Sequence, residues 1–164
     1  MTKGRGRFSK RGLILTVIIL AAITAASFIV YVVPQNSGTI FVTTDYAAQL
    51  DSVSNIHNTL QISFQEQYEM VLSGQITVDE YVQAAQVLSD QTVGQISILA
   101  TTGPPAEWSE SYSAYTESLR AFNSMLRESV ILMDDMQSVD TLNRIAQLNT
   151  TTHDYIEMSA SARP

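Results

Sequence analysis

Hydrophobic residues recur with helical spacing in four segments of the last 120 residues of the chain. In the first segment the inward positions step alternately by four and three residues, and they are Tyr46, Leu50, Val53, His57, Leu60, Phe64, Gln67 and Val71. This period of about 3.5 residues is typical of helices that pack in a bundle or a coiled coil. The pattern predicts helices over residues 45–73, 78–101, 105–136 and 140–158.

Residues that stop or cap helices separate these segments. The breaks fall at Gly74, at Gly103-Pro104-Pro105 and near Ser138. Thr77 and Glu80 have the spacing of a capping box, in which each side chain accepts a hydrogen bond from the other residue's backbone N–H. Four amphipathic helices with short connections predict an all-α domain over residues 45–160, organised as an up-down-up-down four-helix bundle.

The third segment carries the strongest stripe of inward positions. The stripe runs from Trp108 to Met136, and Ser129 is its only polar member. A continuous stripe implies that Met133 and Met136 both face the core. The fourth segment is the most polar, and we expect it to fray after Met158.

A different pattern precedes the bundle. Residues 12–33 carry no charge over 22 positions. At a rise of about 1.5 Å per residue they would extend roughly 33 Å, enough to cross a hydrocarbon core of about 30 Å. They therefore predict a transmembrane helix, followed by a linker over residues 34–44. The alternative is a signal peptide cleaved near Ala25-Ala26-Ser27, but the apolar core of such peptides is usually only about 7–15 residues long.

Charge changes sign across this predicted helix. Residues 1–11 carry five basic residues and no acid, whereas residues 34–164 carry four arginines, no lysine and all 16 acids, a net charge of −12. Because basic flanks stay in the cytoplasm, we expect a single-pass protein of the cell membrane with its N-terminus in the cytoplasm and its C-terminus outside. The lipid bilayer is then one partner, and the negative outer part disfavours nucleic acid.

Small residues gather on one side of the predicted transmembrane helix. Ala21 with Ala25, and Ala22 with Ala26, form overlapping small-xxx-small pairs. Such pairs allow another helix to approach closely. They predict a membrane-protein partner, or self-association through this helix.

Composition and motifs exclude several classes of enzyme. The chain has no cysteine, which excludes disulfide scaffolds and cysteine-ligated metals. It also lacks the glycine-rich nucleotide loops, the GxSxG elbow of hydrolases and the HExxH motif of zinc proteases. We therefore expect no enzymatic activity and no cofactor.

Two histidines offer the only metal chemistry that the sequence suggests. If the fourth helix runs antiparallel beside the first, His57 and His153 lie at a similar level along the bundle axis. Asp154 or Glu157 could then join the two imidazoles around copper or zinc. The four residues follow no recognised metal-binding spacing. We therefore expect no metal, with His57 mostly buried and His153 partly exposed.

Two further features stay open at the level of sequence. Trp108, Tyr112 and Tyr115 share one helix face, where they either line a small-molecule pocket or, as is more usual, pack in the core. Asn149 begins the one N-x-[ST] sequon of the chain, but it falls within a predicted helix, and the sequence does not decide whether it is glycosylated.

Two stretches resemble uncharacterised single-pass membrane proteins of ammonia-oxidising archaea: FSKRGLILTVIILAAITAASFIVYVVPQNSG and PAEWSESYSAYTESLRAFNSMLRES. This resemblance implies an archaeal cell surface and supplies no catalytic residues. The outline is also similar to four-helix sensor domains of chemoreceptors, but without their second membrane helix or signalling region.

An anchor and a helical bundle both provide surfaces for other proteins. The sequence therefore favours an interaction or accessory subunit of a membrane complex, and the archaeal resemblance suggests a membrane oxidase such as ammonia monooxygenase as one complex to test. The alternative is an extracytoplasmic sensor or small-solute-binding module, and a metal-binding protein is the third hypothesis.

Overall fold

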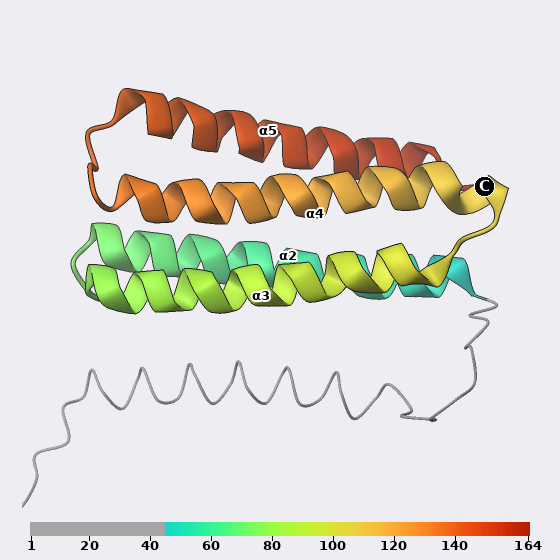
Figure 1. Cartoon of the computed structure of the whole chain (residues 1–164), viewed down its shortest axis with the longest axis horizontal. Helices are drawn as coiled ribbons and strands as arrows, with labels where there is room; N and C mark the ends of the chain where they lie inside the picture. Colours follow the sequence, from blue (N-terminus) through green and yellow to red (C-terminus); the bar gives the residue numbers. More distant parts are fainter. Residues whose placement is uncertain (1–44) are drawn as a thin grey trace, which may run out of the picture. The chain divides into compact units, whose positions relative to one another are not determined.

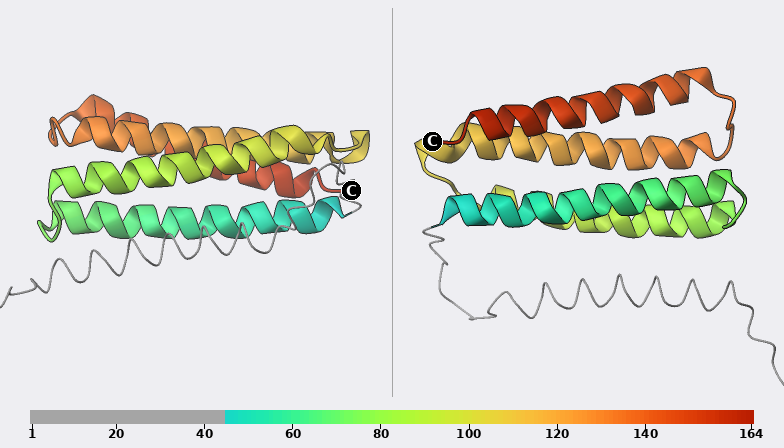
Figure 2. Two further views of the ribbon diagram at one scale, coloured as in Figure 1. Left: turned by 60° about the horizontal axis from the view of Figure 1, so that its bottom comes forward. Right: turned by 180° about the vertical axis from the view of Figure 1, so that it is seen from behind.

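A computed structural model describes residues 45–164, which form four α-helices (Figure 1). The helices are α2 (Tyr46–Leu72), α3 (Val78–Thr102), α4 (Ala106–Leu132) and α5 (Val139–Ser161). Consecutive helices run in opposite directions and lie side by side, as the two further views in Figure 2 also show. The predicted all-α, four-helix packing is confirmed for this part of the chain.

The membrane-related predictions concern other residues. Residues 1–44 lie outside the described part, and with them the predicted transmembrane helix, the linker and the four alanines Ala21, Ala22, Ala25 and Ala26. Within residues 45–164, no helix combines the length and the hydropathy that crossing a bilayer requires.

Local chemistry fixes the helix ends near the predicted places. The backbone N–H of Thr77 donates to Glu80 Oε2 at 2.8 Å, and the N–H of Glu80 donates to Thr77 Oγ1 at 3.2 Å, which confirms the capping box. Gly74 and Gly103 follow the ends of α2 and α3 with φ of +68° and +59°. This left-handed backbone costs glycine little, because glycine has no Cβ.

The third helix is shorter than predicted. It ends at Leu132, because the N–H groups of Met133, Asp134 and Asp135 donate to carbonyls three residues back instead of four. The chain then turns toward α5. Met133 remains buried, but Met136 lies in the turn with 44 % of its surface exposed. The prediction that Met136 faces the core was therefore wrong.

The fourth helix is longer than predicted, continuing to Ser161 instead of fraying after Met158. Contacts near its end explain this. The Ser159 side chain is buried, its backbone carbonyl accepts a hydrogen bond from Ser111 Oγ at 2.8 Å, and Arg163 forms an ion pair with Asp51 of α2 at 2.7 Å.

The core runs along the whole bundle in three clusters. One lies where α2 begins, one at mid-height, and one beside the turns that join α2 to α3 and α4 to α5. Their central buried residues are Leu50, Tyr112 and Leu119 in the first cluster, Leu60, Phe122 and Leu126 in the second, and Val71, Tyr81 and Leu132 in the third. Helices α2, α3 and α4 each contribute to all three clusters. Of the four helices, α4 has the most buried residues and contacts each of the other three, so it is the central helix of the packing.

Candidate functional site

His57 lies on α2 inside the core, and its side chain is fully buried. Its Nδ1 lies 3.2 Å from the Tyr115 hydroxyl oxygen, and the Phe122 ring packs against the imidazole with ring centroids 5.0 Å apart. Its Nε2 is buried with no hydrogen-bond partner among the described residues. Burial, and secondarily the charge of His153, lower the pKa of His57 to about 4. The imidazole is therefore neutral at pH 7.

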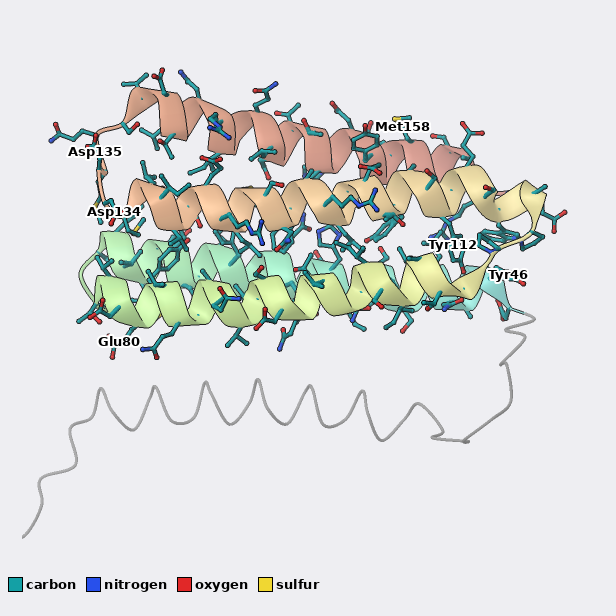
Figure 3. All side chains as sticks on the ribbon, viewed as in Figure 1. Tyr46, Glu80, Tyr112, Asp134, Asp135 and Met158 are labelled. Atoms are coloured by element: carbon teal, nitrogen blue, oxygen red, sulfur yellow. The ribbon has the colours of Figure 1, made fainter. Side chains whose placement is uncertain are left out.

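His153 is exposed on α5, so the predicted contrast between the two histidines is confirmed. Asp154 and Glu157 are exposed as well, and they line a separate open groove of about 510 Å³ with Glu110 and Met158. Figure 3 shows Met158 on the outer side of α5. No three His, Asp or Glu side chains of residues 45–164 are arranged to hold a metal ion.

The aromatic candidates pack in the core. Tyr112 and Tyr115 are buried among aliphatic residues, and the half-buried Trp108 packs edge-on against Tyr112 at a centroid distance of 6.4 Å. The Tyr112 hydroxyl donates to the Tyr46 carbonyl at 2.9 Å, and Figure 3 shows these two residues together at one end of the bundle. Desolvation raises the pKa of Tyr112 to about 12. These rings therefore join helices to one another, and they do not line the groove that Asp154 and Glu157 form.

Several buried hydroxyl groups are satisfied within the bundle. Tyr81 Oη donates to Ser129 Oγ at 2.6 Å, which links α3 to α4. Ser129 Oγ in turn donates to the Leu126 carbonyl at 2.7 Å. Ser89 Oγ donates to Asn123 Oδ1 at 2.6 Å and makes a second link between the same helices. Buried polar groups paired in this way specify how helices fit together, so we assign them a structural role.

The clearest unpartnered surface lies at the end of the bundle that holds the α2–α3 and α4–α5 turns. Six large hydrophobic side chains are exposed there by 38–66 %. We call this group the loop-end surface, and its members are Leu72, Val78, Ile131, Met136, Val139 and Leu142. The described residues expose twelve large hydrophobic side chains in total, so half of them come from two short segments, 72–78 and 131–142. Both segments flank one core cluster at this end of the bundle, since Ile76 packs on the same cluster as Leu132 and Met133.

Carboxylates surround the loop-end surface. Asp79, Asp134, Asp135 and Asp140 are exposed, and Figure 3 shows Asp134 and Asp135 at this end of the bundle. None of the four forms an ion pair with a described residue. The segments 70–82 and 130–142 contain no lysine, arginine or histidine. The nearest basic residues are Arg127 in the adjoining groove and Arg144, which pairs with Glu128, so the carboxylates outnumber the cations here. This end of the bundle is therefore apolar and negatively charged.

A shallow groove continues from the loop-end surface along the seam between α3 and α4. It has a volume of about 270 Å³ and shares Ile131 with that surface. Its other lining residues are Val82, Ala85, Gln86, Ser89, Leu126, Arg127 and Val130. The groove therefore extends the apolar contact area beyond the loop end, and it adds the cationic Arg127 one turn before Ile131.

Sequence reasoning did not find the loop-end surface. The periodic patterns place Val78, Met136 and Leu142 on inward-facing stripes, whereas these side chains are 38 %, 44 % and 43 % exposed, and Val139 lies on no stripe. A signal was present, because Val139 comes directly after the Ser138 cap and Leu72 lies two residues before the break at Gly74, so neither continues an inward stripe. What the sequence did not show is that the two turns lie at the same end of the bundle, beside one core cluster.

Comparison with known proteins returned no similarity: no family model, no curated protein and no solved structure matches the chain. The geometry of the bundle and the charge pattern of the sequence are therefore the basis for a functional proposal.

Proposed function

We propose that this chain is a membrane-anchored interaction protein, an accessory subunit that recruits or stabilises a partner in a membrane complex. Residues 12–33 are the anchor, residues 1–11 lie in the cytoplasm, and the bundle lies outside. The change in net charge from +5 to −12 across the uncharged segment supports this orientation. Ala21, Ala22, Ala25 and Ala26 offer a second contact, to a neighbouring transmembrane helix or to another copy.

The loop-end surface is the observation that carries the proposal. Monomeric soluble proteins rarely leave large contiguous apolar patches open to water, and such patches mark sites of interaction. Here Val139 and Ile131 expose 66 % and 54 % of their surface at the same end of the bundle. A partner that covers them would gain about 25 cal/mol for each Å² of apolar surface removed from water.

A sensor or solute-binding module is the alternative function. That function needs an enclosed cavity in which a ligand loses most of its contact with water. Tyr112 and Tyr115, the aromatic residues that would line such a cavity, are instead buried in the core cluster that contains Leu119. We therefore favour a protein partner over a small ligand.

Topology is tested first. Sealed, right-side-out membrane vesicles that contain the full chain are treated with trypsin, which can cut after Arg120, Arg127 and Arg144 but not at the Arg163–Pro164 bond. We expect digestion of the bundle and protection of the basic tail. Protection of the bundle in sealed vesicles, together with its digestion once detergent opens them, would refute the proposed orientation.

The interaction is tested by affinity purification of the full chain in a mild detergent. We expect a partner to be recovered with the wild type and lost with the double variant Val139→Ser/Leu142→Ser. The matched control is Val87→Ser/Val93→Ser, which replaces two exposed hydrophobic residues of α3 outside the loop-end surface. Repeated recovery of the protein alone, or equal loss in both variants, would contradict the proposal.

A further inference from the structure

We propose that the loop-end surface binds a basic protein, one that presents lysine or arginine side chains around an apolar contact area. This inference rests on the proposed function and specifies the chemistry of its partner. It follows from the combination of exposed hydrophobic side chains with carboxylates that no described residue neutralises.

The carboxylates are placed to act at the rim of a contact. Asp134 and Asp135 lie in the turn between α4 and α5, while Asp79 and Asp140 lie in the first turns of α3 and α5. All four are exposed, and none is paired with a cation of the described residues. In protein complexes, rim charges set partner choice and association rate, while the apolar centre supplies most of the affinity.

A lipid surface does not fit this end of the bundle. Natural membranes are commonly anionic, and segments that dock on them carry clusters of lysine and arginine. The segments 70–82 and 130–142 carry carboxylates and no basic residue. The same charge would repel an anionic headgroup layer.

A second copy of the bundle does not fit either. In a two-fold symmetric contact the same patch meets itself, so two sets of the four carboxylates would face each other. Like charges opposed across an interface cost several kcal/mol. The bundle as a whole carries four arginines against sixteen acids, so it attracts a basic partner and repels its own copies.

The distribution of lysine provides a direct test. A carbodiimide joins a carboxylate to an amine in direct contact, and the only lysines of the sequence are Lys3 and Lys10. Membranes that contain the full chain are treated with the reagent, and the linked peptides are identified by mass spectrometry. We expect links from Asp134 or Asp135 to lysines of another protein. Links that arise mainly from Asp154 or Glu157, or that lead to Lys3 or Lys10 of a second copy, would overturn the inference.

Matched variants test the charges separately from the apolar centre. Asp134→Asn/Asp135→Asn keeps an oxygen that can accept the hydrogen bond from the Gln137 N–H. We expect it to abolish the cross-link and to lower recovery of the partner at least tenfold at 0.1 M salt. The control, Asp154→Asn/Glu157→Gln, neutralises two exposed carboxylates on another face, and we expect wild-type recovery from it.

Salt gives the second readout. An increase from 0.1 M to 1 M shortens the screening length from about 10 Å to about 3 Å, and we expect a loss of recovery similar to that of the Asp134/Asp135 variant. If the partner is lost with Val139→Ser/Leu142→Ser but is insensitive to salt and to removal of the two aspartates, this inference fails while the proposed function stands. If neither double variant differs from its control, both fail.

Discussion

The buried imidazole of His57 should make the stability of the bundle depend on pH. In the folded chain its pKa is about 4, because the ring is desolvated and lies near His153, whereas an unfolded chain has a histidine pKa of about 6.5. Between these two values the unfolded state binds more protons than the folded state. The contribution of His57 to the free energy of unfolding is therefore fully present above pH 6.5 and is lost as the pH drops from 6.5 to 4.

The size of this loss follows from the two pKa values. Each pH unit between them lowers the free energy of unfolding by about 1.4 kcal/mol. The loss through His57 is therefore about 2 kcal/mol at pH 5 and approaches about 3 kcal/mol below pH 4. Because a domain of this size is stable by roughly 5–15 kcal/mol, a loss of 2 kcal/mol is readily measured.

The assay uses the one tryptophan of the chain. Trp108 packs against Tyr112 on α4, so its fluorescence reports unfolding of the bundle even in the full chain with its hydrophobic segment. Urea unfolding is measured at pH 7.5 and pH 5 for the wild type and for His57→Leu. Leucine removes both the titration and the unpaired Nε2.

We expect the variant to lose about 2 kcal/mol less than the wild type between pH 7.5 and pH 5. The control is His153→Gln, which changes an exposed residue that is only the secondary cause of the lowered His57 pKa. It should keep most of the pH dependence. If His57→Leu and the wild type lose the same stability, His57 does not control the acid response, and the proposed consequence of its burial is refuted.

Four other substitutions test the packing and the helix ends, each by the same Trp108 fluorescence. Leu119→Ala empties a fully buried position and should cost about 2–5 kcal/mol; a loss below 1 kcal/mol would contradict its place in the core. Thr77→Ala removes the capping box and should cost about 1 kcal/mol, whereas no change would show that the cap is replaced by water. Tyr81→Phe removes a buried donor and should cost about 1 kcal/mol. Gly103→Ala meets no atom within 4 Å but has a φ of +59°, so any loss, about 1 kcal/mol, measures backbone strain alone.

Features set by local chemistry could be predicted from the sequence. The Thr77–Glu80 box needs only residues three apart, and Gly74 and Gly103 lie where a left-handed backbone ends a helix. The burial of His57 followed from its place in an apolar stripe of spacing three and four. Its partner Tyr115 could not be predicted, because that contact depends on how α2 and α4 are aligned along the bundle axis.

The errors arose where a periodic pattern continued beyond the structure that it describes. Met136 fits the stripe of α4, but the helix has already ended at Leu132 through a tightened last turn. Periodicity carries no information on that ending, whereas the consecutive residues Asp134 and Asp135 are of a type that favours turns. The loop-end surface was missed for a related reason, since it exists only where two turns distant in sequence are brought together by the fold.

The fold itself does not require the loop-end surface to be apolar. Val139 is the first residue of α5, and the cap of that helix comes from the Ser138 side chain, which accepts a hydrogen bond from the Thr141 N–H. Met136 lies in a turn whose recorded hydrogen bonds are made by other residues. Polar side chains at these exposed positions would lose few contacts with the core. Exposed substitutions usually change the free energy of unfolding by less than about 0.5 kcal/mol. The Val139→Ser/Leu142→Ser variant should therefore lose no more than about 1 kcal/mol of the free energy of unfolding, which leaves the bundle folded, so that a lost partner reports lost contact and not a damaged bundle.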